Sequence, residues 1–146
     1  MNFFELHTAY DLFKKLEQDL QDLERSYQDA RVAYNLFVTA EHLPDWLGKR
    51  DLVSKHAILR ITSHLANGAK HFHLKDHRHN SIIETERYRV FEEDVFEPGV
   101  FYEPLIIYLS DKEAEELERE TIDALTLAKK LIEFWKPYVQ KPVTEL

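Results

Sequence analysis

The feature that most constrains this 146-residue chain is an apolar periodicity near its start. Apolar or aromatic side chains recur every three or four residues, at Leu6, Tyr10, Phe13, Leu16, Leu20, Leu23, Tyr27, Ala30, Tyr34 and Phe37. This spacing places them on one side of an α-helix and puts the charged residues between them on the other side. The pattern predicts a long amphipathic helix that either protrudes from the domain or breaks near Thr39 to His42.

A second helix is expected from about Asp51 to about Lys75, after a connection marked by Pro44 and Gly48. Its main apolar stripe consists of Ile58, Ile61, Leu65, Gly68 and Phe72. A narrow polar stripe, with spacings of four, three and four, consists of Arg60, His64, Asn67 and His71. On a helix these four side chains fall within about 60° of one another. The pattern is typical of a mostly buried helix with one polar seam.

The chain changes character between residues 80 and 109. A partly alternating segment begins at Ile82, the turn sequence Glu97-Pro98-Gly99 follows, and Leu105 begins an apolar run of strand length. We expect two or three antiparallel strands packed on the helices, since a hairpin by itself is marginally stable. The segment Ser110 to Glu113 has the pattern of a capping box, which predicts a last helix that Pro137 ends.

These elements predict a mainly α fold. The expected architecture is a four-helix-like bundle with a small antiparallel β-hairpin insertion at about residues 82–109, in a single domain over residues 1–146. The composition agrees, because 44% apolar residues with only three glycines favour an ordered, helical chain. The aromatic face of the first helix is wider than one partner helix would cover, so we also expect a homodimer.

The sequence also gives an expectation for the compartment. Its first residues carry acids before the pair Lys14-Lys15 and contain no continuous apolar stretch, so we expect neither a signal peptide nor a membrane partner. The chain has no cysteine, which excludes disulfides and thiolate sites. We therefore predict a cytoplasmic protein.

Candidate chemistry is concentrated between Arg60 and His79, a stretch that holds five of the eight histidines. It lies in the only segment with a net positive charge, residues 49–80, of a chain whose net charge is −8. A guanidinium and an imidazole four residues apart on a helix can meet at one phosphate and cleave RNA through its own 2′-hydroxyl, without a metal. Arg60 and His64 are therefore the candidate catalytic residues. The candidate ligand-binding residues are His42, Asn67, Lys70 and His71.

Two other interpretations of the same stretch stay open. The side chains of His71, His73, Asp76, His77 and His79 are all potential ligands for zinc, nickel or copper. Their spacing matches neither the HExxH signature nor a Cys/His signature, so we predict neither a metal nor another cofactor. In the structural alternative, Arg60 pairs with an acid such as Glu41 or Asp45, and His64 and Asn67 satisfy buried polar groups.

Three segments carry a family resemblance. They are TAEHLPDWL at residues 39–47, RITSHLANGAKHF at 60–72 and TIDALTLAKKLIEFW at 121–135. Together they resemble a family of small bacterial and phage-borne helical proteins with an ANGxKHF core. More distantly, an arginine followed by a histidine on a bundle helix resembles the HEPN superfamily, whose helical domains commonly dimerise. That superfamily includes metal-independent ribonucleases and nucleotide-binding partners. It has four to six residues between the arginine and the histidine, where this chain has three between Arg60 and His64.

The functional expectation is a HEPN-like helical protein with a polar groove that binds RNA or another phosphate-bearing ligand. Two alternatives come from different classes. One is a non-enzymatic interaction protein of phage or host-defence type, and the other is a metal-binding bundle.

Overall fold

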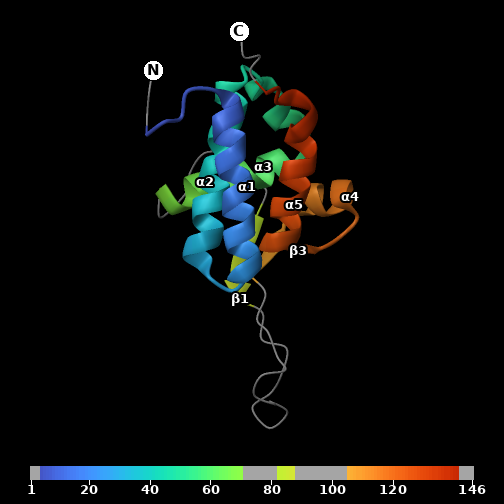
Figure 1. Ribbon diagram of the computed structural model, residues 1–146. Helices are drawn as coiled ribbons and strands as arrows, with labels where there is room; N and C mark the ends of the chain where they lie inside the picture. The colour runs from blue at the N-terminus through green and yellow to red at the C-terminus, as the bar shows by residue number, and fades with distance from the viewer. Residues whose placement is uncertain (1–3, 71–81, 88–104, 142–146) are drawn as a thin grey trace, which may run out of the picture.

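The computed structural model of the protein describes residues 4–70, 82–87 and 105–141. Its elements in chain order are α1 (Ala9–Arg25), α2 (Ala30–Trp46), the 3-10 helix η1 (Arg50–Lys55), α3 (Ala57–Lys70), β1 (Ile82–Arg87), β2 (Leu105–Leu109), α4 (Asp111–Leu117), β3 (Thr121–Asp123), α5 (Ala124–Trp135) and the 3-10 helix η3 (Lys136–Tyr138) (Figure 1). The predicted fold class is confirmed: the protein is mainly helical with a small antiparallel sheet.

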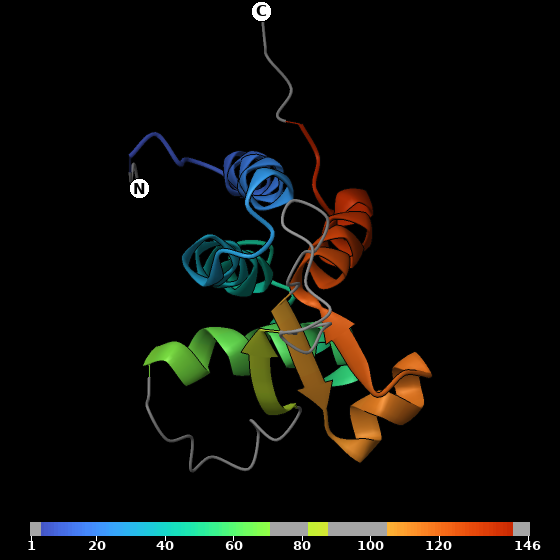
Figure 2. The same ribbon diagram turned by 90° about the horizontal axis from the view of Figure 1, so that it is seen from below.

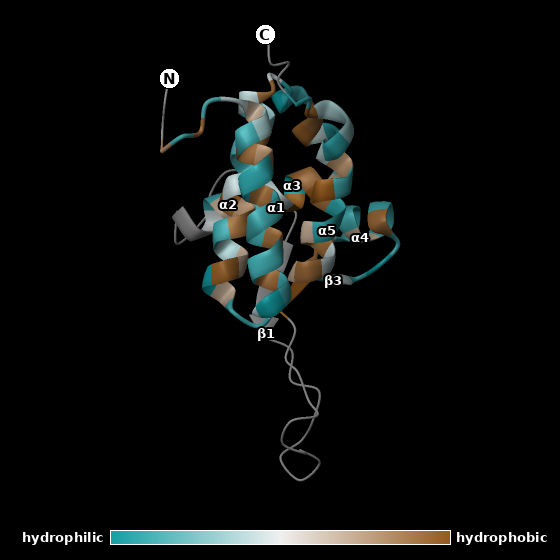
Figure 3. Ribbon diagram, in the orientation of Figure 1, coloured by the Kyte–Doolittle hydropathy of each residue, from teal (hydrophilic) through white to brown (hydrophobic). Residues whose placement is uncertain are grey.

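The single long helix predicted at the start of the chain is wrong. Helix α1 ends at Arg25, and α2 begins after four intervening residues and packs against it. The Asp29 carboxylate accepts a hydrogen bond from the backbone N–H of Arg31 at 2.9 Å and so caps the start of α2. A helical hairpin buries both apolar stripes against each other, whereas one continuous rod would expose half of that apolar surface to water. Figure 3 shows the resulting brown and teal faces on each helix.

The break predicted near Thr39 to His42 is also wrong, because these residues lie inside α2. Helix α2 continues through Pro44 to Trp46, and the chain turns at Gly48, whose φ of +67° is in the left-handed region that favours glycine. The backbone N–H of Lys49 donates to the carbonyl of Pro44 at 2.7 Å and closes this turn. Gly48 therefore marks the connection, as predicted, while Pro44 belongs to the helix before it.

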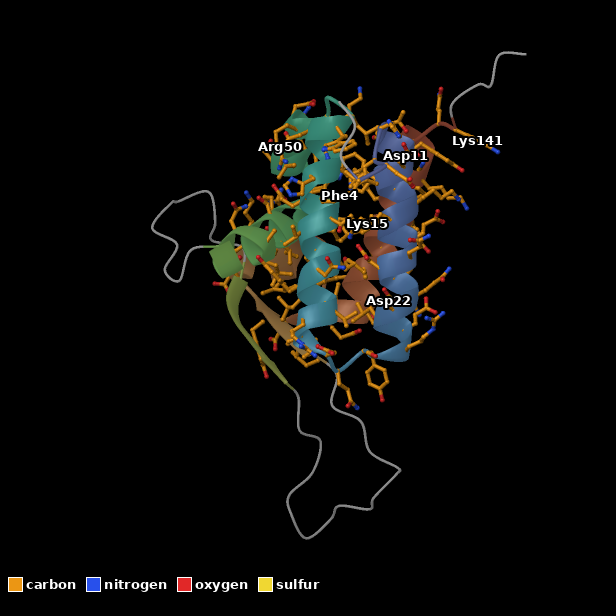
Figure 4. All side chains as sticks on the ribbon, turned by 60° about the vertical axis from the view of Figure 1, so that its left-hand side comes forward. Phe4, Asp11, Lys15, Asp22, Arg50 and Lys141 are labelled. Atoms are coloured by element: carbon orange, nitrogen blue, oxygen red, sulfur yellow. The ribbon has the colours of Figure 1, made fainter. Side chains whose placement is uncertain are left out.

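A buried polar cluster joins α1 to α2. The carboxylate of Asp19, which is 5% exposed, accepts hydrogen bonds from Lys15 Nζ at 2.9 Å, Asn35 Nδ2 at 3.0 Å and Thr39 Oγ1 at 2.8 Å. Lys15 Nζ also donates to Thr39 Oγ1 at 2.8 Å, and Figure 4 shows Lys15 midway along α1. These bonds satisfy a carboxylate that would otherwise be costly to bury, and they fix how the two helices are aligned along each other.

Helix α3 and the sheet lie on the side of α2 that faces away from α1. Figure 2 shows this arrangement with α1, α2 and α5 seen nearly end-on. Helix α3 is preceded by η1, so the helix predicted from Asp51 begins later, at Ala57. The structure describes it as far as Lys70. The largest fully buried apolar side chains come from α1, α2, α3, β3 and α5: Leu16, Leu23, Leu36, Leu43, Ile61, Ile122, Leu127, Leu131 and Trp135.

The sheet is antiparallel and has the strand order β1-β2-β3. The predicted pairing of the segments near Ile82 and Leu105 is confirmed, while β3 is an additional strand that interrupts the predicted last helix. Two observations explain the interruption. Ile122 is fully buried opposite Ile107, and Glu118 has left-handed backbone angles that end α4. Asp123 then caps α5 by accepting a hydrogen bond from the N–H of Thr126, and α5 ends at Trp135, two residues before Pro137.

Candidate functional site

Arg60 lies in the first turn of α3 and is engaged on all three nitrogens of its guanidinium. Its Nε and Nη2 donate to the two oxygens of Glu113 at 2.9 and 2.6 Å, in a bidentate ion pair. Nη2 also donates to Glu116 at 2.7 Å, and Nη1 donates to the carbonyl of Ser54 at 2.7 Å. The side chain of Arg60 is 12% exposed and that of Glu113 is 1% exposed. One arginine thus ties η1, α3 and α4 together.

The two carboxylates that meet Arg60 both lie on α4. Ser110 does take the N-cap position of α4, but its side chain makes no capping hydrogen bond, so the predicted capping box is wrong. The glutamate half of the box is lost because the Glu113 carboxylate pairs with the guanidinium of Arg60. The other acid, Glu116, accepts the backbone N–H of Ala57 at 2.6 Å. That contact places a negative charge at the N-terminus of α3, where the helix dipole favours it.

The ion pairs shift the pKa values of these groups. The hydrogen bonds from Arg60 to Glu113 are the main reason that the pKa of Arg60 is raised, which keeps the guanidinium charged. Burial raises the pKa of Glu116, but the hydrogen bonds from Arg60 and from the N–H of Ala57 outweigh it, so the pKa lies below its ordinary value of 4.5. Glu116 is therefore ionised at neutral pH.

We predict that the contribution of Glu116 to stability depends on pH. A carboxyl whose pKa is lowered by folding contributes stability above its ordinary pKa, and this contribution is lost as the pH falls through the lower, folded value. Wild type should therefore melt above the variant Glu116→Gln at about pH 7, and the difference should shrink as the pH falls below 4.5, the ordinary pKa of this group. Thermal melts across this range measure it, with Glu115→Gln as an exposed control on the same helix. A difference that grew on acidification would contradict the assigned ion pair.

Arg50, and not Arg60, pairs with the acids of α2. Its Nε and Nη2 donate to the two oxygens of Asp45 at 2.9 and 2.8 Å. Its Nη1 bonds the Glu41 carboxylate, and Nη2 also donates to the Glu41 carbonyl at 2.7 Å. The hydrogen bond from Arg50 is the main cause of a pKa of Asp45 below its usual value. Glu41 and Asp45 therefore do form ion pairs, as the structural alternative predicts, but with Arg50 and not with Arg60. Figure 4 shows Arg50 at the end of the molecule where η1 follows α2.

The middle of α3 contacts α2 through Ser63, to which Asn67 is hydrogen-bonded. The Asn67 amide donates to the Ser63 carbonyl at 2.7 Å and lies 3.4 Å from its hydroxyl oxygen. The Ser63 hydroxyl donates to Glu41 at 3.2 Å, and His64 is half-buried next to it in the sequence. Arg60 therefore reaches across to α4, while Asn67 bonds within its own helix. The predicted polar stripe is split between these two environments.

Two of the other predicted ligand-binding residues belong to described helices. His42 is exposed on α2, and Lys70 is the last residue of α3. His71 and the rest of the histidine cluster up to His79 lie outside the described residues. Within residues 4–70, 82–87 and 105–141, no group of three or more histidine, aspartate or glutamate side chains is placed to hold a metal ion.

Sequence reasoning missed the residues that complete this site. The sequence pattern indicates Glu113 only as part of a helix start, and it singles out none of Glu116, Ser54 and Arg50. One signal for Glu113 was available. An acid in the first turn of a helix can form an ion pair with a buried arginine instead of capping the helix. Nothing in the spacing identified Arg60 as that arginine.

Comparison with protein-family models, with curated proteins and with solved structures found no match to this chain. The resemblance to the ANGxKHF family and to the HEPN superfamily therefore stays a prediction. Among the described residues, no helix is both long enough and apolar enough to cross a membrane.

Proposed function

We propose that this protein is a non-enzymatic interaction protein that acts by binding a protein partner. The observation that carries the proposal is the state of Arg60, whose three guanidinium nitrogens are all hydrogen-bonded within the protein. A phosphate-binding arginine must offer its donors to the ligand. Arg60 instead offers them to two carboxylates and a carbonyl, so its geometry suits the joining of helices better than chemistry on a phosphodiester.

The cost of releasing Arg60 supports the same conclusion. A phosphate that captured the guanidinium would leave Glu113 buried and ionised with no cation beside it. Removing one partner of a buried ion pair costs about 3–5 kcal/mol, and the phosphate would also add negative charge beside two carboxylates. The binding of a phosphate would have to offset this cost, which would weaken its net affinity.

The surface of the described residues offers groups suited to protein binding. Tyr34, Trp46 and Tyr138 are each at least 40% exposed. Tyrosine and tryptophan are the residue types that most often dominate the binding energy of protein interfaces.

We also propose that the protein works in the cytoplasm. The chain has no cysteine, and this composition supports the proposal.

A phosphate-bearing ligand or RNA is the second candidate, and one observation favours it. Helix α3 is continuous from Ala57 to Lys70, so His64, Asn67 and Lys70 follow one another at spacings of three along a single helix. In this HEPN-like alternative, the second half of α3 would bind the ligand. Arg60 would not contact the ligand and would only hold α3 in place.

Thermal melting with and without a structured RNA tests the proposal against the RNA-binding alternative. We expect an excess of RNA in EDTA to leave the melting temperature of the wild type unchanged within about 1 °C, because a ligand that does not bind the folded state does not stabilise it. We also expect the RNA to stay intact. A rise of several degrees, together with cleavage that the variant His64→Ala abolishes, would replace the interaction role with a ribonuclease.

A further inference from the structure

The solvent-facing side of α2 carries five side chains in one line. They are Arg31, Tyr34, Val38, His42 and Asp45, and we call them the α2 stripe. At 100° per residue they fall within an arc of about 80°. The side chains of Arg31 and Asp45 are 94% and 59% exposed, Tyr34 is 42% exposed, His42 is exposed and Val38 is half-buried. In Figure 4, which brings α2 forward, no described helix or strand lies in front of it.

The α2 stripe is symmetric in position and complementary in charge about Val38. Tyr34 and His42 lie four residues on either side of Val38, and Arg31 and Asp45 lie seven residues on either side. If a second α2 runs antiparallel across the first with Val38 facing Val38, each Arg31 faces Asp45 of the other copy. Each Tyr34 ring then faces the other His42 ring. A self-complementary patch of this kind is what a two-fold symmetric interface requires.

We propose that two copies of this chain pair through their α2 stripes, antiparallel, with Val38 on the two-fold axis. The partner that the surface fits is a second copy of the chain. A second copy places Asp45 opposite Arg31 and His42 opposite Tyr34. Two cation-carboxylate pairs flank a central contact of aromatic, imidazole and valine side chains, over a helix length of about 21 Å. Such flanking charges fix the register and orientation of paired helices.

Both charged residues have bonding capacity left for this interface. Asp45 accepts two hydrogen bonds from Arg50, and a carboxylate has sites for about four. Among the described residues, the carboxylate paired with Arg31 is that of Asp29, with the Arg31 Nε 3.7 Å from the Asp29 oxygen, which is longer than a hydrogen bond. The guanidinium of Arg31 can therefore reach outward without breaking a strong contact.

Cysteine cross-linking tests the two-fold axis directly, because the chain has no cysteine of its own. The variant Val38→Cys places one thiol on the axis, where it meets its own copy, and mild oxidation should convert most of the protein to a disulfide-linked dimer. Gln21→Cys, on the exposed side of α1, is the matched control and should stay largely monomeric. Cross-linking of Val38→Cys that is no faster than that of the control would overturn the proposal.

Sedimentation of the unmodified chain and of Arg31→Asp provides the second measurement, which does not depend on a cysteine. Arg31→Asp places two carboxylates opposite each other at both ends of the interface and should weaken dimerisation about tenfold. The control Lys14→Asp reverses an exposed charge in the first half of α1, which is not part of the α2 stripe, and should leave the dimerisation constant unchanged. A wild type that stays monomeric at tens of micromolar, or a dimer that Arg31→Asp does not weaken, would rule out this interface.

Discussion

Replacing Arg60 by methionine should lower the free energy of unfolding by about 3–5 kcal/mol. Methionine keeps most of the apolar stem of the arginine but removes its charge. Glu113, which is 1% exposed, is then left buried without the cation that balances it. Urea denaturation of the wild type and of Arg60→Met, followed by circular dichroism, measures the difference.

The matched control is Arg50→Met, because Arg50 also binds two carboxylates but lies at the surface. Its side chain is 40% exposed and that of Asp45 is 59% exposed, so water replaces the contacts with Asp45, while Glu41, at 15% exposed, keeps its hydrogen bond from Ser63. We expect this variant to lose less than about 1 kcal/mol. Equal losses from the two variants, or a loss below about 1 kcal/mol in Arg60→Met, would show that burial does not distinguish the two ion pairs.

Replacing Trp135 by alanine should cost about 3–5 kcal/mol. The side chain closes the core at the end of α5 and is 0% exposed. It packs edge-on against the rings of Phe134, at a centroid distance of 4.9 Å, and Tyr138, at 5.5 Å. Removing the indole therefore opens a large cavity that rigid neighbours on α5 and η3 cannot fill. Denaturant unfolding measures this loss too.

The variant Trp135→Phe separates packing from hydrogen bonding. Among the described residues the indole N–H of Trp135 has no hydrogen-bond partner, so phenylalanine removes no bond and should cost less than about 2 kcal/mol. Tyr138→Ala, at a residue that is 40% exposed, should cost less than Trp135→Ala. If phenylalanine were as destabilising as alanine, a polar contact of the indole would be responsible and not the volume of the ring.

The sequence predicted the helical faces better than it predicted where helices end. Phe13, Leu16, Leu23 and Phe37 belong to the predicted apolar stripe and are buried. Ala30 and Tyr34 belong to the same predicted stripe but are exposed, because α2 starts a new helix whose buried face is set by its own packing. The turn between α1 and α2 was missed because two helices joined by a short loop can continue the same spacing of three and four residues. The signal that was present is Asp29, an N-cap residue type that lies inside an otherwise apolar pattern.

The ion pairs of Arg60 could not be predicted from spacing. Arg60 and Glu113 are separated by 53 residues, and the chain offers 27 acidic residues as partners. Only the packing of α4 against α3 decides which acid reaches the guanidinium. The third strand was missed for a related reason: three residues are too short for a periodic signal, and Thr121 to Asp123 form a strand because Ile122 fits opposite Ile107.

The central claim is that Arg60 is a structural tie between α3 and α4, and a double-mutant cycle with Glu113 tests it most directly. The four proteins are the wild type, Arg60→Met, Glu113→Met and the double variant, each unfolded in urea. We expect the double variant to be more stable than the sum of the single losses predicts, by at least about 2 kcal/mol, because two apolar side chains can replace a buried ion pair. Losses that add within about 0.5 kcal/mol would contradict the claim.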